Sequence, residues 1–146
     1  MKRLYQIRRV FTKAILFEGE YETYADCVQA ACDAGIDLSR ANFQAQDLSG
    51  IRARNFNFTR ACFTDAVATG ATFQGCGMSG IQGNLLNATA AKFHGANLTD
   101  AMLKNATLDD AEFTGAETTG IKLEGASLTG IVRDLHSGGG FEPDEG

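Results

Sequence analysis

The sequence reads Ala41-Asn42-Phe43-Gln44-Ala45, later Ala96-Asn97-Leu98-Thr99-Asp100 and Ala126-Ser127-Leu128-Thr129-Gly130, and this five-residue pattern recurs without insertion or deletion from Ile36 to Leu135. Leu or Phe occupies thirteen of the twenty central positions. Ala occupies eleven of the positions two residues earlier, and Gly occupies nine of the positions two residues later. A period of five fits neither an α-helix nor a flat strand, so this pattern predicts a chain that turns at regular intervals.

One corner every five residues closes a square coil of twenty residues. Stacked coils can then hydrogen-bond to one another as parallel strands do, about 4.8 Å apart. Gly near a corner supplies the positive φ that a tight turn requires. The repeats of residues 36–135 therefore predict about five coils in a rod roughly 24 Å long. Residues twenty apart should stack in columns, one of which reads Ala53, Phe73, Phe93, Phe113 and Arg133.

Three of the small residues at central positions coincide with large residues two positions earlier, as Ala53 does with Ile51, whereas Ala68 follows the small Ala66. Gly83 follows Ile81, and Ala88 follows Leu86. Close packing requires such an exchange of volume if both positions point into one narrow core.

These units resemble the A-[D/N]-L/F-x-x signature of the pentapeptide repeat family, over 100 of the 146 residues. The resemblance implies an all-β solenoid, namely a right-handed quadrilateral β-helix. The strands expected before the repeats are similar to those of short, single-domain bacterial or phage members of the family.

The segments on either side of the repeats differ from them. Residues 1–35 predict two short strands within 2–21 and a capping helix that Thr23 opens and Gly35 ends. Residues 136–146 are rich in Gly and acidic residues and predict a flexible tail. The last coil would be left uncapped, and an uncapped edge favours a dimer through Ile131, Val132 and Leu135.

The composition favours a cytoplasmic protein. The four Cys residues show no C-x-x-C pair and no disulfide spacing, and no apolar run is long enough to span a membrane. No signal peptide or cofactor motif is present, so we expect no cofactor and no metal.

The sequence favours binding over catalysis. A square rod offers flat faces rather than a concave site, so we expect no enzyme activity. His94 should lie on the surface, Cys62 should point outward, and Cys76 should pack in the core. We therefore expect a protein-interaction or structural module with rigid faces.

Charged residues sort onto two faces that could bind a partner. One face carries only acids, Asp47, Asp109 and Asp110. The next face is mildly basic, with Arg52, Arg54, Lys92 and Arg133 against Glu112 and Asp134. The family resemblance also implies an alternative, a DNA mimic that modulates DNA gyrase as quinolone-resistance members do. Residues 36–135 hold ten acidic and eight basic residues, whereas a duplex of that length carries about 14 negative charges. The charge therefore disfavours the mimic, and four basic residues without exposed aromatics argue against direct nucleic-acid binding.

Overall fold

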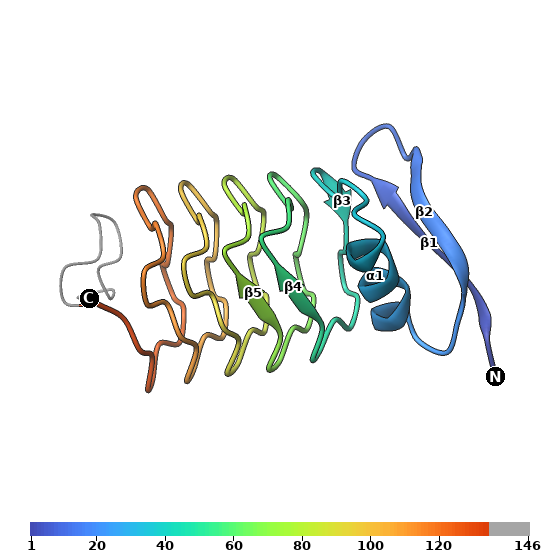
Figure 1. The fold of residues 1–146 in the computed structure, drawn as a ribbon. Coiled ribbons are helices and arrows are strands. Elements are labelled where there is room, and N and C mark those ends of the chain that lie inside the picture. Colours follow the sequence, from blue (N-terminus) through green and yellow to red (C-terminus); the bar gives the residue numbers. More distant parts are fainter. Residues whose placement is uncertain (135–146) are drawn as a thin grey trace.

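In a computed structural model, residues 1–134 form a stack of square coils with a β-hairpin and a helix at its N-terminal end, and these are the residues that the structure describes. The N-terminus lies at the end of the molecule that carries the hairpin and the helix (Figure 1), and the chain then runs coil by coil toward the other end.

The N-terminal segment consists of two strands and one helix. Strands β1 (Arg3–Arg9) and β2 (Ile15–Tyr21) pair antiparallel. Helix α1 (Tyr24–Asp33) begins after the N-cap residue Thr23, whose Oγ1 accepts a hydrogen bond from the Asp26 N–H at 3.0 Å. Its buried face contributes Cys27, Val28 and Ala31 to the same core as the coils.

The hairpin also joins the first coil, which the sequence analysis did not anticipate. Strand β3 (Ala41–Asn42) pairs antiparallel with β1, so the strand order of this sheet is β2-β1-β3. The hairpin is therefore tied to the repeats by backbone hydrogen bonds as well as by apolar contacts.

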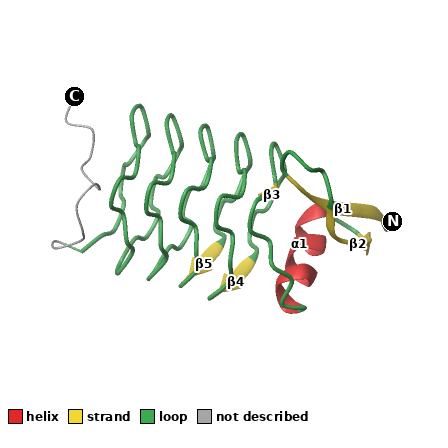
Figure 2. Ribbon diagram, turned by 90° about the horizontal axis from the view of Figure 1, so that it is seen from above, coloured by secondary structure: helices red, strands yellow, loops and turns green. Residues whose placement is uncertain are grey.

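The coils pair in parallel at a spacing of twenty residues, as the sequence predicts. Strands β4 (Arg52–Arg54) and β5 (Thr72–Gln74) lie side by side (Figure 2). Elsewhere the pairing consists of isolated bridges, which run from Asn42↔Cys62 to Glu112↔Val132. The expected parallel ladders are therefore very short, because each side of the coil turns again before a longer strand can form.

The corners differ from the expectation that Gly supplies their geometry. The positions two residues after each centre have positive φ whether or not they are Gly; the non-Gly examples are Arg40, Ala45, Asn55, Arg60, Asp65, Leu85, Ala90, Asp100, Asn105 and Asp110. Left-handed φ costs a residue with a Cβ about 1–2 kcal/mol. The stacking of coils above and below evidently imposes the corner conformation on whichever residue occupies it.

The core is a stack of apolar layers along the rod axis. Phe73, Phe93 and Phe113 form the predicted column, each with 1% of its surface exposed. Their rings are nearly parallel, with centroids 5.4 Å apart for Phe73–Phe93 and 5.0 Å apart for Phe93–Phe113. The column ends at Arg133, which is exposed rather than inward.

Candidate partner-binding groove

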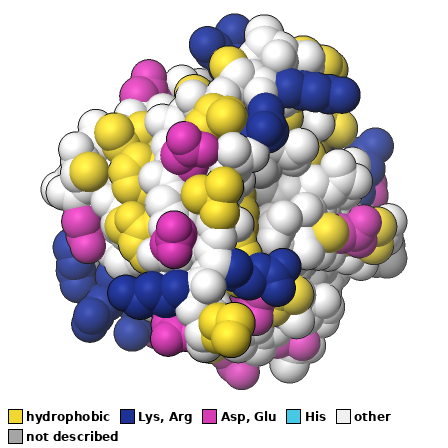
Figure 3. All heavy atoms as spheres, turned by 90° about the vertical axis from the view of Figure 1, so that its right-hand side faces the viewer, with side chains coloured by type: hydrophobic (Ala, Val, Ile, Leu, Met, Phe, Trp, Pro, Cys, Tyr) yellow, Lys and Arg dark blue, Asp and Glu magenta, His cyan; other side chains and the backbone are white. Residues whose placement is uncertain are grey.

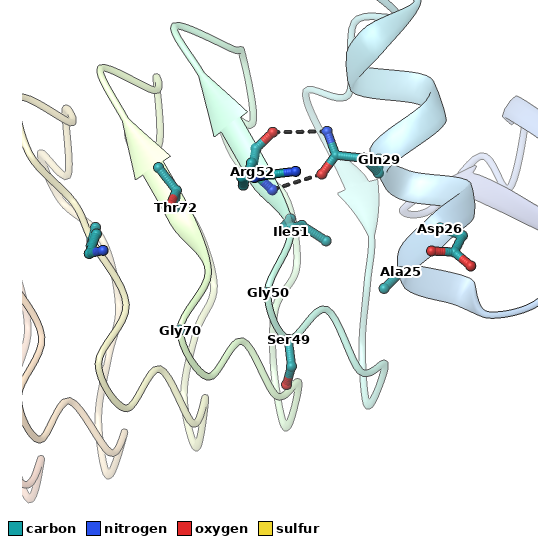
Figure 4. A pocket seen from close by; sticks show the side chains of 10 residues that line it. Ala25, Asp26, Gln29, Ser49, Gly50, Ile51, Arg52, Gly70 and Thr72 are labelled. Carbon is teal, nitrogen blue, oxygen red and sulfur yellow. Dashed lines mark hydrogen bonds between the residues drawn. The ribbon is translucent and has the colours of Figure 1, made fainter.

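A groove lies between helix α1 and the first coils, on the face that carries the predicted basic residues (Figure 4). Its volume is about 450 Å³. One wall is α1, and the floor is the β4–β5 face with the corner before it. Its lining residues are Ala25, Asp26, Gln29, Ser49, Gly50, Ile51, Arg52, Gly70, Thr72 and Lys92.

The wall and floor of the groove are fixed to each other by the Gln29 side chain. Its Oε1 accepts a hydrogen bond from the Arg52 N–H at 2.7 Å, and its Nε2 donates to the Arg52 carbonyl at 2.9 Å. In the next coil, the Thr72 N–H donates in the same way to the Ile51 carbonyl. The amide of Gln29 thus takes the place of a peptide group from a preceding coil, and satisfies the edge that strand β4 would otherwise expose.

We expect Gln29→Ala to lower the free energy of unfolding by about 1–2 kcal/mol, because two backbone groups of Arg52 lose their partner at the end of the stack. Chemical denaturation followed by circular dichroism measures this loss. The control is Gln74→Ala, which removes an exposed amide whose contact is the Arg54 guanidinium. An equal loss in both variants would contradict the capping role of Gln29.

The groove brings together two of the predicted basic residues. The Arg52 and Lys92 side chains are exposed, and within residues 1–134 neither takes part in an ion pair or a side-chain hydrogen bond. Arg54 lies beside them on the same face, outside the groove, where its Nη1 donates to Gln74 Oε1. Both cations can therefore bind an anionic group of a ligand. The groove also contains one carboxylate, that of Asp26 on the α1 wall.

The predicted acidic residues are not brought together in the same way. Asp47 accepts a hydrogen bond from the Ser49 N–H at 2.9 Å, which holds the pKa of the Asp47 carboxyl below its usual range. Asp109 lies three coil repeats farther along that face, where it accepts from the Thr129 N–H at 3.1 Å and from the Ser127 hydroxyl. Asp110 occupies a corner with φ +61°. The Asp47 and Asp109 carboxylates therefore accept hydrogen bonds from backbone N–H groups, and Asp47 lies apart from Asp109 and Asp110.

The remaining predicted residues are engaged in local contacts. His94 Nε2 lies 2.6 Å from Glu112 Oε1 on the basic face. Cys76 is buried, as predicted, and burial raises the pKa of its thiol. Cys62, expected to point outward, lies outside the apolar core cluster but is not exposed, because only 8% of its surface is accessible and its Sγ lies 3.6 Å from Thr64 Oγ1. Cys32 is half-buried. Burial is the main cause that raises the pKa of its thiol to about 12, and electrostatic repulsion from Cys76 and Asp33 adds to it, so the thiol stays protonated at neutral pH.

Three further features bear on function. The part of the chain that the structure describes contains no cluster of His, Cys, Asp and Glu able to hold a metal ion. None of its helices is both long and apolar enough to cross a membrane. At the C-terminal end, Ile131 is half-buried and Val132 is 50% exposed, while Leu135 lies outside the described residues.

Comparison with family models identifies the repeat. The model for pentapeptide repeats matches residues 36–75 and 91–130 in eight copies. The chain belongs to the pentapeptide repeat family. The unmatched stretch between these ranges holds Gly83 in place of a large central residue, yet its bridges keep the register, with Gln82 paired to Cys62 on one side and to Met102 on the other. Local departures from the family pattern therefore leave the coil geometry intact.

Solved structures of this family resemble the chain in part. They include Rfr23 from the cyanobacterium Cyanothece 51142 (24% identity, 66% of this chain and 62% of that one, TM-score 0.37). HetL of Nostoc sp. strain PCC 7120, involved in heterocyst differentiation regulation, shares 22% identity over 77% of this chain and 62% of its own, with a TM-score of 0.35. A trypsin-treated form of QnrB1, a plasmid-mediated fluoroquinolone resistance protein, shares 20% sequence identity over 62% of this chain and 58% of its own, with a TM-score of 0.37. The chain spans about three fifths of the length of these proteins. The search of curated proteins found no match.

Proposed function

We propose that this pentapeptide repeat protein is a non-catalytic interaction module that binds an acidic segment of a protein partner in the groove beside α1. The observation that carries the proposal is the pair of exposed cations Arg52 and Lys92, which have no ion-pair partner within residues 1–134 and line a concavity of about 450 Å³ on a protein of net charge -5. We favour binding over catalysis in this groove, because the one His within the described residues, His94, lies outside the groove and is paired with Glu112.

Rigidity supports the same proposal. We infer a rod of five coils over residues 36–135, closed at its N-terminal end by residues 1–35 with α1 as the cap. A surface fixed by backbone hydrogen bonds loses little conformational entropy when it binds, so a modest number of polar contacts suffices. The four free thiols, three of them buried, fit a cytoplasmic setting.

The test is the double variant Arg52→Glu/Lys92→Glu, with Lys104→Glu/Lys122→Glu as a control that reverses two exposed charges elsewhere. Proteins captured from a bacterial lysate by the immobilised natural chain are quantified against both variants. We expect the captured amount of at least one protein to fall about tenfold with the groove variant and to stay unchanged with the control, because each reversed charge in the groove turns attraction into repulsion. Equal capture by all three chains would overturn the proposal.

The gyrase alternative has less support from the charge distribution. Asp109 and Asp110 lie together, but Asp47 is three coil repeats away and the adjoining face is basic. A duplex mimic needs a continuous negative surface. We therefore expect the purified protein, in large molar excess, to leave gyrase supercoiling unchanged with and without a quinolone. Inhibition or drug protection at micromolar concentration would favour the mimic instead.

We also propose that two copies associate through the C-terminal coil. The support is the exposed, apolar Val132 at the last bridge of the stack, next to the half-buried Ile131. We expect a dimer by light scattering and a monomer for Val132→Asp. The matched control is Leu85→Asp, because Leu85 is 53% exposed, close to the 50% of Val132, but lies on a corner midway along the rod. A monomeric natural chain would contradict this interface.

A further inference from the structure

A second hollow lies where the β1–β2 turn meets a corner of the rod, and none of its lining residues lines the α1 groove. Its volume is about 300 Å³, and it is lined by Val10, Phe11, Arg40, Arg60, Gly80 and Gln82. It belongs to a molecular end where Lys and Arg side chains gather in several groups (Figure 3). Residues 1–60 hold nine Lys and Arg against seven acids, whereas residues 61–146 hold four against eleven.

The turn presents an aromatic side chain to solvent. Phe11 is 91% exposed and has φ +65°, a conformation that favours Gly or Asn over a bulky residue. The turn is nevertheless well anchored, because the Val10 N–H donates to the Arg40 carbonyl at 2.8 Å and the Arg9 N–H donates to the Ala14 carbonyl at 2.8 Å. A strained, anchored and exposed aromatic residue contributes nothing to this fold by packing, and such residues are typical of binding surfaces.

The floor of the hollow is cationic. Arg40 and Arg60 stand twenty residues apart at the same corner, so they belong to neighbouring coils about 4.8 Å apart. Both are exposed, both have φ +61°, and within residues 1–134 neither side chain has an ion-pair or hydrogen-bond partner. Two adjacent cations at positions where other corners carry Gly repel each other unless an anion lies between them.

We propose that residues 141–146 of the same chain occupy this hollow. They read Phe141-Glu142-Pro143-Asp144-Glu145-Gly146, which offers one aromatic ring for the Phe11 surface and three carboxylates for the two arginines. Gly138, Gly139 and Gly140 precede them, and Gly, which lacks a Cβ, is compatible with the turn that such a path requires. The charge of this segment is opposite to that of the hollow, and its composition matches both of the hollow's components.

The length of the tail allows this contact within one molecule. Phe141 is seven residues beyond Asp134, which corresponds to a reach of about 23–25 Å. Gly80, at the near end of the hollow, lies two coils before Gly120, or about 10 Å along the rod axis. The remaining reach is enough to cross one face of the rod, which is five residues wide. Docking would cover the Arg40–Arg60 corner and leave the α1 groove open, so this contact is independent of the function proposed for that groove.

The experiment compares amide NMR spectra of the full natural chain with those of a full-length tail variant, Phe141→Ala/Glu142→Gln/Asp144→Asn/Glu145→Gln. We expect shift differences at Phe11, Arg40, Arg60 and Gly80 that do not change on dilution and that disappear at about 1 M salt, where screening is nearly complete. The same two chains are then compared in an Arg40→Glu/Arg60→Glu background, where we expect the differences to vanish. In an Arg52→Glu/Lys92→Glu background they should persist.

Three results would overturn the proposal. The first is identical spectra for the natural chain and the tail variant. The second is a set of differences that survives Arg40→Glu/Arg60→Glu. The third is a set that grows with protein concentration, which would assign the occupant to the tail of a second copy. None of these results bears on capture by the α1 groove, which Arg52→Glu/Lys92→Glu tests separately.

Discussion

We expect Phe93→Ala to lower the free energy of unfolding by about 3–5 kcal/mol, the usual cost of removing a buried aromatic side chain. Phe93 is 1% exposed and lies between the rings of Phe73 and Phe113, at centroid distances of 5.4 and 5.0 Å. The substitution leaves a cavity in the middle of the rod. Backbone hydrogen bonds above and below hold the coils apart, so the neighbouring rings have little freedom to close it.

Chemical denaturation followed by circular dichroism measures this effect, and two further variants separate its causes. Phe93→Leu retains most of the volume but not the ring stacking, so we expect a loss of about 1–1.5 kcal/mol. Phe11→Ala removes the same side chain from a site that is 91% exposed, and we expect a change within about 0.5 kcal/mol. A loss below about 2 kcal/mol for Phe93→Ala would mean that the coils collapse into the cavity.

The repeat register could be predicted from the sequence because a single geometric rule governs it. A period of five with large, small and Gly positions determines which residues point inward, and the bridges twenty residues apart confirm the predicted columns. The rule is local and is repeated along the chain, so departures such as Gly83 do not obscure it. The same reasoning could not predict that only 8% of the Cys62 surface is exposed, because the pattern gives the direction of a side chain but not what covers it.

The groove could be predicted only in part. The five-residue period places Arg52 and Lys92 on one face, but the wall opposite them depends on how α1 docks against the first coil. That docking rests on the buried face of α1 and also on Gln29, a polar residue that in a sequence looks like any solvated side chain. The pairing of β1 with β3 was missed for a similar reason, since a strand of two residues gives no periodic signal.

The repeat rule and the structure make opposite predictions at Gly83. The consensus residue taken alone is Leu or Phe at this central position, so Gly83→Leu would be expected to fill a gap and stabilise the protein, although the exchange of volume with Ile81 already argues against a gap. In the structure, a Cβ at residue 83 would lie 2.7 Å from Leu103 Cδ2 and 3.3 Å from the Met102 carbonyl oxygen. The space is therefore already filled, chiefly by the side chain of the next coil and not only by Ile81 as the sequence suggested.

We accordingly expect Gly83→Leu to lower the free energy of unfolding by about 1–3 kcal/mol, as overpacking of a dense core does. The control is Gly77→Ala, where the nearest atoms to the new Cβ lie 3.5 Å away and where the loss of Gly from the unfolded chain should be neutral or slightly stabilising. The double variant Gly83→Leu/Leu103→Ala removes the clashing side chain, so it should recover more than half of the loss. If Gly83→Leu alone raises stability in the denaturation assay, the coils can shift to accept the consensus residue, and Gly83 does not mark a filled position.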